Sequence, residues 1–224
     1  MSVVANQSHH GHRLLVAIKA AAGAPGPPLS LPAGSPPFAL LRPVATSPGR
    51  TNPGDVKALT EWRNRHQTAF LHEFQATEKR TERWLTQTVG PDDGRILFMV
   101  DDLGGRAFAY IGLALIDWTS LGCEVDSVLR GMPAPRDAMA TVHQSLIAWA
   151  RGTLGLERVS LRARADNPVA LAFYRNMGYV EEQRVPLRSL STDDGKLWIE
   201  EPALNDAEVE IIYMSLGHQT ERAE

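Results

Sequence analysis

The chain has 224 residues, of which 43% are hydrophobic and 22% charged, and its formal net charge is −3. This apolar content is enough for a packed core and excludes a chain that is disordered throughout. A pI near 6.2 gives no positive field for a nucleic acid, and no apolar run approaches the roughly 20 residues that span a bilayer. The single cysteine, Cys123, excludes a disulfide framework. The composition predicts a soluble, cytoplasmic protein that binds neither nucleic acid nor membrane.

The first part of the chain is expected to lie outside the folded domain. Residues 20–37 are crowded with Ala, Gly, Ser and Pro, a composition typical of an extended linker. We therefore expect a disordered leader over residues 1–37, one domain over residues 38–217 and a polar tail over residues 218–224.

The expected domain alternates between strand-like and helix-like patterns. Asp55 and Thr77 are plausible N-caps of two helices, and residues 101–105 form a hairpin signal between two strands. The expected elements in chain order are a strand at 38–44, helices after Asp55 and Thr77, strands at 96–100, 107–118 and 123–130, a helix bearing Val142, Leu146 and Trp149, a strand at 159–163, a helix from Asn167-Pro168 to Gly178, and strands at 180–187 and 209–216. This order predicts an α+β fold.

The segment from Asn167 to Tyr179 carries the most specific signal. Asn167 provides a side-chain acceptor at a helix N-cap, and Pro168 suits the first helical position. Ala170 and Tyr174 share one helix face because they are four residues apart. A tyrosine hydroxyl on such a face is able to protonate a departing thiolate, which is general-acid catalysis. The alternative is that Tyr174 only packs and Asn167 only caps.

This segment resembles the second signature of the GCN5-related N-acetyltransferase (GNAT) superfamily, to which Asn167, Ala170, Tyr174, Gly178 and Tyr179 match at the set intervals. The resemblance implies a mixed, mostly antiparallel central sheet flanked by helices, with strands 123–130 and 159–163 as a parallel, splayed pair. It also implies acetyl-CoA as the acyl donor, with its pantetheine arm between those strands. The implied contacts to this arm are Val128, Asn167, Ala170 and Tyr174.

The loop that would bind the donor's pyrophosphate departs from the family pattern. In the family the pyrophosphate rests on main-chain N–H groups at a helix start, here Arg136 to Met139 with Asp137 and Ala138 between them. The loop has one glycine and two prolines, which donate no hydrogen bond. Asp137 is expected to cap the helix and repel phosphate, whereas Arg130 and Arg136 would contact phosphate or pair with Asp137. A non-catalytic GNAT-fold binding domain with a degenerate CoA site is therefore an alternative.

Two carboxylates in the strand before this loop are candidates for the general base. Glu124 and Asp126 alternate onto one face of the strand, and a carboxylate is able to take the proton of an acceptor amine. The family resemblance places a catalytic glutamate at the position of Glu124, so Asp126 comes second. The alternative is that both side chains face solvent. No metal is required, and Cys123 has no identifiable partner for work as a nucleophile.

The acceptor side is expected to involve the first two helices. Residues 59–64, Phe70 and 77–84 resemble the branch that includes ribosomal-protein N-terminal acetyltransferases and amino-sugar-nucleotide acetyltransferases, which implies acceptor contacts at Arg63, Asn64 and His66. The basic character of this region slightly favours an anionic small molecule. The sequence thus predicts an acetyl-CoA-dependent N-acetyltransferase for a primary amine of a small molecule, an amino-sugar nucleotide being one candidate. A protein N-terminus is the alternative acceptor, and a homodimer is compatible with the fold.

Overall fold

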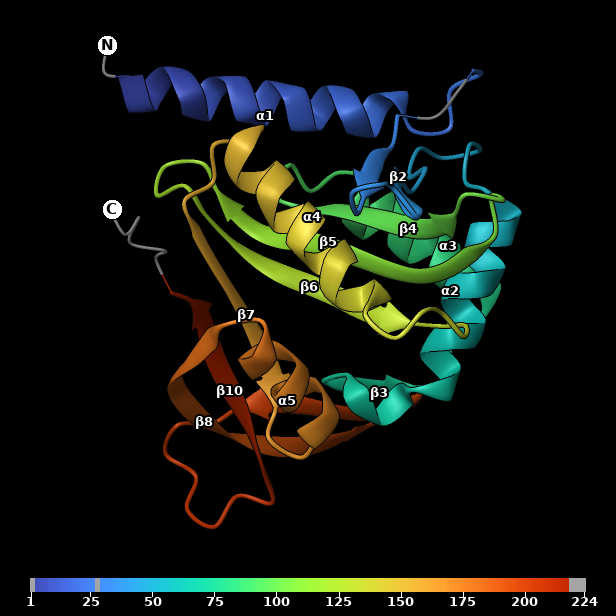
Figure 1. The fold of residues 1–224 in the computed structure, drawn as a ribbon. Helices are drawn as coiled ribbons and strands as arrows, with labels where there is room; N and C mark the ends of the chain where they lie inside the picture. Colours follow the sequence, from blue (N-terminus) through green and yellow to red (C-terminus); the bar gives the residue numbers. More distant parts are fainter. Residues whose placement is uncertain (1–2, 27–28, 218–224) are drawn as a thin grey trace. The chain divides into compact units, whose positions relative to one another are not determined.

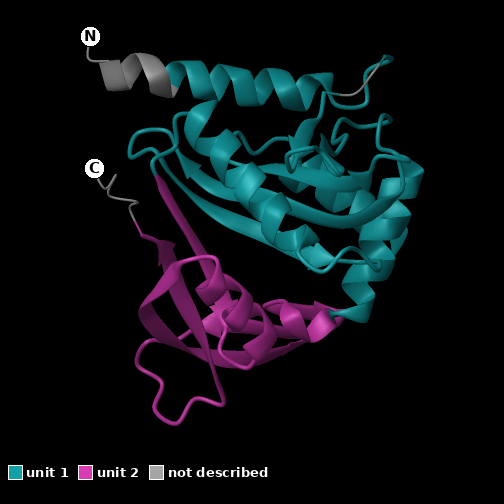
Figure 2. Cartoon of the chain, in the orientation of Figure 1, with its two compact units in different colours: residues 1–66, 76–157 teal, residues 67–75, 158–224 magenta. Residues whose placement is uncertain are grey.

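The computed structural model describes residues 3–26 and 29–217, with side chains from residue 9 onward. The chain divides into two compact units, shown in Figure 2. The first unit comprises residues 1–66 and 76–157, and the second comprises residues 67–75 and 158–224. The segment between the first two helices of the expected domain thus belongs to the second unit.

The first unit is an antiparallel sheet flanked by helices (Figure 1). Its strands lie in the order β1 (Leu31–Ala33), β2 (Ala39–Pro43), β4 (Ile96–Asp102), β5 (Ala107–Asp117) and β6 (Gly122–Arg130). Its helices are α1 (Val3–Ala21), α2 (Pro53–Arg65), α3 (Glu78–Trp84), the π-helix η2 (Leu85–Val89) and α4 (Ala138–Gly152).

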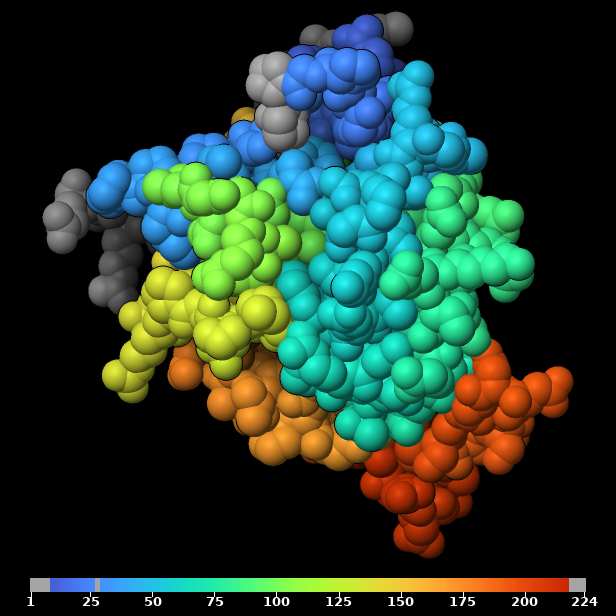
Figure 3. Space-filling view, turned by 90° about the vertical axis from the view of Figure 1, so that its right-hand side faces the viewer, coloured from blue at the N-terminus to red at the C-terminus, as the bar shows by residue number. Residues whose placement is uncertain are grey.

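Helices α2 and α4 pack on opposite faces of this sheet. In the β4–β5 pair, Phe98 lies opposite Ile111 and Met99 lies opposite Tyr110, so Phe98 and Tyr110 point to different faces. Trp149 of α4 contacts Phe98 edge-on, with 5.5 Å between ring centroids. Trp62 of α2 stacks on Tyr110 at 6.2 Å and an interplanar angle of 4°. Figure 3 views the face that α2 and α3 cover.

The leader contains regular structure instead of the disordered chain expected for residues 1–37. Helix α1 buries Leu15 completely, and β1 pairs with β2. Gly11 lies so close to the segment after α4 that an added Cβ would stand 2.2 Å from the carbonyl oxygen of Leu154. The linker-like composition lies in the connection after α1. Helix α1 itself is stable because its apolar face packs against other elements of the first unit.

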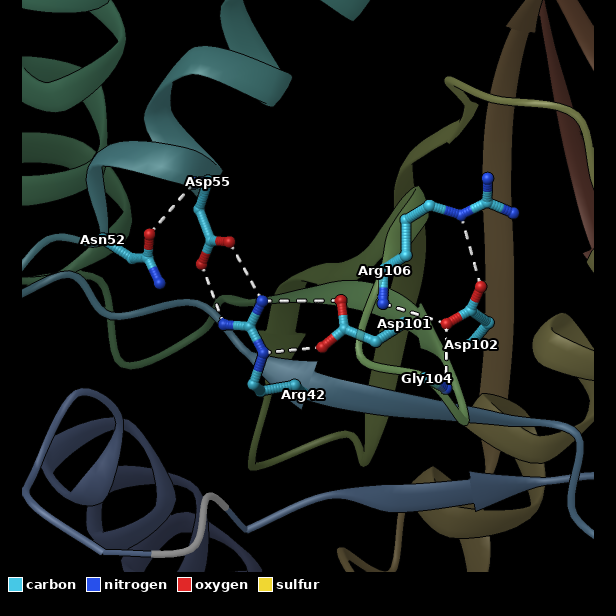
Figure 4. Close-up of polar contacts among 7 residues, drawn as sticks. All are labelled: Arg42, Asn52, Asp55, Asp101, Asp102, Gly104 and Arg106. Carbon is cyan, nitrogen blue, oxygen red and sulfur yellow. Dashed lines mark hydrogen bonds and ion pairs between the residues drawn. The ribbon is translucent and has the colours of Figure 1, made fainter.

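A buried ion-pair cluster joins the sheet to the start of α2 (Figure 4). The guanidinium of Arg42 on β2 binds both carboxylate oxygens of Asp55 at 2.9 Å. Its Nε binds Asp101 of β4 at 2.7 Å. These contacts raise the pKa of Arg42, chiefly through the hydrogen bonds to Asp55, against the opposing effect of burial.

The second unit contains antiparallel strands and one α-helix, α5 (Pro168–Asn176), in the part of the unit that the structure describes. The strands lie in the order β7 (Arg158–Arg164), β10 (Val209–Leu216), β8 (Tyr179–Thr192), β9 (Gly195–Glu200) and β3 (His72–Phe74). Leu71, between the 3₁₀ helix η1 (Gln67–Ala69) and β3, packs on a core formed by Val185, Leu187, Trp198, Val209 and Ile211.

A second buried cluster fastens β3 to this sheet. Arg164 donates to Glu73 at 2.6 Å and to Asp166 at 2.7 Å, and its guanidinium lies 4.8 Å from the ring centroid of Trp198. The indole N–H of Trp198 donates to the same carboxylate of Glu73 at 2.6 Å. Burial alone would raise the pKa of Glu73, but the Trp198 and Arg164 contacts lower it overall. Glu73 is therefore held as a carboxylate.

The α+β class predicted from the sequence, a mostly antiparallel sheet flanked by helices, is confirmed. The two strands assigned to the parallel pair are β6, in the first unit, and β7, in the second. Strands β3 and β9 were not predicted, and the polar turn at 193–194 connects β8 to β9. No helix within the described residues has the length and hydrophobicity needed to cross a membrane. The polar tail expected over 218–224 lies outside the described residues.

Candidate active site

Both candidate base residues lie on one face of β6, as the alternation predicted. Glu124 pairs with Ala114 and Asp126 pairs with Gly112 across the β5–β6 ladder, whereas Cys123 is buried on the other face. Asp126 accepts a hydrogen bond from Arg95 at 3.1 Å. It also accepts one from the hydroxyl of Ser127 at 3.0 Å. Asp126 is thus committed to an ion pair with Arg95.

A bulge follows these carboxylates, and the sequence analysis missed it. The register changes from Gly112 opposite Asp126 to Tyr110 opposite Leu129, and Ser127 between them has φ of 56°. A bulge removes backbone N–H groups from the ladder and re-aims them, a device that is frequent next to active sites. Serine gave no signal for it, because a positive φ is expected at glycine.

The single glycine of the donor loop is required by packing. A Cβ added to Gly131 would stand 1.9 Å from the ring of Trp62. The carbonyl oxygen of Gly131 accepts a hydrogen bond from Arg65 at 2.7 Å, and its N–H donates to Phe108. The start of the loop is therefore fixed to α2 by Trp62 and Arg65.

The start of α4 is better suited to an anion than the sequence indicated. Asp137 occupies the N-cap position, but its side chain makes no capping hydrogen bond, which corrects the expectation that it satisfies the helix N–H groups. Within the described part of the chain, the exposed side chains of Arg130, Arg136 and Asp137 form no ion pair with one another. Ala138 and Met139 form the first turn. A helix N-terminus flanked by two arginines fits a pyrophosphate.

The three candidate acceptor residues lie at the end of α2 but have different environments. The side-chain amide of Asn64 donates to the carbonyl oxygen of Ala76 at 3.0 Å and accepts a hydrogen bond from the N–H of Ala76 at 2.7 Å. Asn64 therefore joins the two ends of the segment 65–75. His66 is exposed and forms the C-cap of α2. Arg63 is half-buried, and burial is the main reason why its pKa is lowered. Of the three, Asn64 has a clear structural role.

The buried hydroxyl of Tyr110 lies in the electrostatic field of both Arg63 and Asp126. Burial raises the pKa of the Tyr110 hydroxyl well above its usual range. The charge of Arg63 opposes this shift and the charge of Asp126 adds to it. Arg63 and Asp126 therefore act on the same buried group, and the structure brings a candidate acceptor contact and a candidate base residue into one region of the first unit.

The signature residues of the second unit take the predicted local geometry. Asn167 caps α5 by accepting a hydrogen bond from the N–H of Ala170 at 3.1 Å. Tyr174 is buried, with edge-on contacts to Phe173 at 5.4 Å and Tyr179 at 5.9 Å. Capping uses the amide oxygen of Asn167.

Cys123 is unsuited to nucleophilic catalysis. Its side chain is buried, and burial raises the pKa of the thiol to about 12. The thiolate is the nucleophilic form, so it is scarce at neutral pH. The scarcity of the thiolate argues against a covalent intermediate on Cys123.

The first unit thus places two carboxylates directly before a strand bulge and leaves the start of α4 without a side-chain cap. The family model described as "Acetyltransferase (GNAT) domain" matches residues 50–180, so the chain belongs to the GNAT acetyltransferase family. As a member of it, the protein is an N-acetyltransferase that takes the acetyl group from acetyl-CoA.

Solved structures of the same fold are similar to this chain at low sequence identity. A probable GNAT-family acetyltransferase from Chromobacterium violaceum is 16% identical, with a TM-score of 0.63 over 86% of this chain and 92% of that chain. A spermidine N-acetyltransferase from Vibrio cholerae, in complex with CoA and spermine, is 15% identical, with a TM-score of 0.58 over 80% of this chain and 96% of that chain. No curated protein sequence matches the chain.

Proposed function

We propose that the enzyme acetylates a primary amine of a small molecule. The observation that carries this proposal is the placement of Glu124 and Asp126 on one face of β6, directly before the bulge at Ser127. A carboxylate at this place attracts an ammonium group and accepts its proton.

In the proposed reaction, the amine nitrogen attacks the thioester carbonyl carbon and the carbon–sulfur bond then breaks. Glu124 accepts the proton that the amine loses. The hydroxyl of Tyr174 gives a proton to the departing thiolate, and solvent restores that proton to Tyr174. Asn167 orients the pantetheine arm, and the start of α4 with Arg130 and Arg136 binds the pyrophosphate.

The chemistry of the acceptor beyond its amine is supported by two different observations. Arg80 lies close enough to Arg63 that its charge adds to the lowering of the Arg63 pKa. The basic residues of α2 and α3, Arg63, Arg65, Lys79, Arg80 and Arg83, support an anionic acceptor such as an amino-sugar nucleotide, which we place first. A polyamine is the second candidate, supported by the paired carboxylates and by the likeness in fold to a spermidine N-acetyltransferase.

An acceptor panel tests the proposal. Purified enzyme with acetyl-CoA is assayed for release of CoA with a thiol reagent, in parallel with an amino-sugar nucleotide, spermidine and peptides with a free N-terminus. We expect turnover with a small-molecule amine and none with the peptides. Turnover with the peptides alone would transfer the proposal to a protein N-terminus, and no turnover with any amine would contradict it.

Donor binding provides a separate prediction. Calorimetric titration with acetyl-CoA is expected to show micromolar binding, and Arg136→Ala should weaken it about 10-fold because a charge-assisted contact to phosphate is lost. The loss should shrink at high salt because exposed charges are screened. Asp137→Gly should bind at least as tightly as the wild type, and Arg106→Ala, in an exposed hairpin, is the control. Failure of all four proteins to bind would favour the non-catalytic alternative.

A further inference from the structure

Helix α1 lies outside the residues that match the family model, yet it contributes a buried charge to the first unit. Lys19, in the last turn of α1, is only 8% exposed. Its ammonium group donates to the carbonyl oxygen of Val89 at 2.9 Å and to that of Asp92 at 2.5 Å. Burial lowers the pKa of Lys19, and the charges of Asp92 and Asp93 act against that shift. A buried lysine therefore binds the end of a helix 70 residues away in the sequence.

The carbonyl group of Val89 ends η2, and that of Asp92 belongs to the turn between η2 and β4. The last carbonyls of a helix lack intrahelical partners and carry partial negative charge, which an ammonium group stabilises. The carbonyl of Asp92 also accepts the N–H of Arg95 at 3.2 Å. The carboxylate of Asp92 accepts the N–H of Gly94 at 2.8 Å and Nε of Arg95 at 3.4 Å. Lys19 and Arg95 thus share Asp92 as an acceptor.

Arg95 extends this connection to the candidate active site. The guanidinium that contacts Asp92 also binds Asp126 at 3.1 Å, and Asp126 in turn accepts the hydroxyl of Ser127. Ser127 is the residue with positive φ in the bulge of β6. Three contacts therefore separate the ammonium group of α1 from the strand that holds both carboxylates.

The packing of α1 fixes the position of Lys19. Leu15 is completely buried, and Gly11 allows close approach to Leu154 of the segment after α4. The ring of His12 lies 5.3 Å from that of Trp118, and its Nε2 is 3.5 Å from a carboxylate oxygen of Asp93. The helix is anchored between Gly11 and Lys19, so the ammonium group of Lys19 has a defined place.

We propose that Lys19 is a positioning residue for the transfer reaction. It holds the turn at 89–95, the turn orients Arg95, and Arg95 holds Asp126 and Ser127 in the conformation that the bulge requires. This inference rests on the proposed function, because it assigns the contact an effect on acetyl transfer.

Lys19→Met tests the proposal, since methionine keeps an apolar stem and removes the ammonium group. We expect kcat to fall about 10-fold through misplacement of the site, with acetyl-CoA binding unchanged. Hydrogen exchange at the amides of Gly94 and Arg95 should become at least about 10-fold faster. Lys19→Arg should keep most of the activity. Arg13→Met, an exposed position on the same helix, is the control and should change neither quantity.

A double-mutant cycle separates positioning from a general loss of stability. In an Arg95→Gln background, Lys19→Met should lower kcat no further if its effect passes through Arg95. An equal loss in both backgrounds, or unchanged exchange at Gly94 and Arg95, would overturn the proposal. The exchange comparison needs no acceptor, so the connection is tested even if the wild type acetylates none of the amines and the proposed function fails.

Discussion

Arg42→Met is expected to lower the free energy of unfolding by about 3–5 kcal/mol, the usual cost of removing one partner from a buried ion pair. The substitution leaves Asp55 and Asp101 with no guanidinium, at side-chain exposures of only 6% and 10%. Both carboxylates would have to remain charged without a partner or take up a proton, and either outcome costs stability. Chemical denaturation followed by circular dichroism measures the change.

The neighbouring hairpin offers a matched control for this prediction (Figure 4). Arg106 pairs with Asp102 at 3.3 Å, but its side chain is 70% exposed. Arg106→Met should change stability by no more than about 1 kcal/mol, because exposed ion pairs contribute little. If Arg42→Met and Arg106→Met lowered the free energy of unfolding by similar amounts, burial would not explain the contribution of the Arg42 cluster to stability.

The starts of α5 and α2 show where local sequence patterns predicted a helix cap and where they did not. The pair Asn167-Pro168 correctly predicted the start of α5. The identical pair Asn52-Pro53 starts α2, where Asn52 accepts the N–H of Gly54 at 2.8 Å, although Asp55 was expected to be the cap. Asp55 is in the first turn, and its carboxylate is used by Arg42. A cap and an ion-pair partner look alike in sequence, because both are short acidic or amide residues near a helix start.

The sequence predicted the local geometry of the candidate site but not its contacts between residues distant in the chain. Alternation placed Glu124 and Asp126 on one face, since a strand has a period of two. The pairing of Asp126 with Arg95, and the contact of Gly131 with Trp62, join residues distant in sequence that no spacing rule relates. The fold of the leader was missed for the same reason, because α1 is stabilised by packing.

Glu124→Gln is expected to lower kcat about 100-fold to 10,000-fold, the usual contribution of a positioned general base. Glutamine keeps the size of the side chain but accepts no proton, so acetyl-CoA binding and stability should stay close to wild type. The defect should shrink as the pH rises toward the pKa of the acceptor amine, because a neutral amine needs no base before it attacks. Initial rates of CoA release between neutral and alkaline pH measure both effects.

Two further variants make this assignment specific. Asp126→Asn should reduce kcat less than Glu124→Gln, because Asp126 is bound by Arg95 and Ser127 and is expected to position the strand and not to move a proton. Tyr174→Phe should reduce turnover strongly with little loss of donor binding, because the departing thiolate then lacks its proton donor. If Asp126→Asn showed the larger, pH-dependent loss, the two carboxylates of β6 would exchange roles: Asp126 would be the base and Arg95 the residue that orients it.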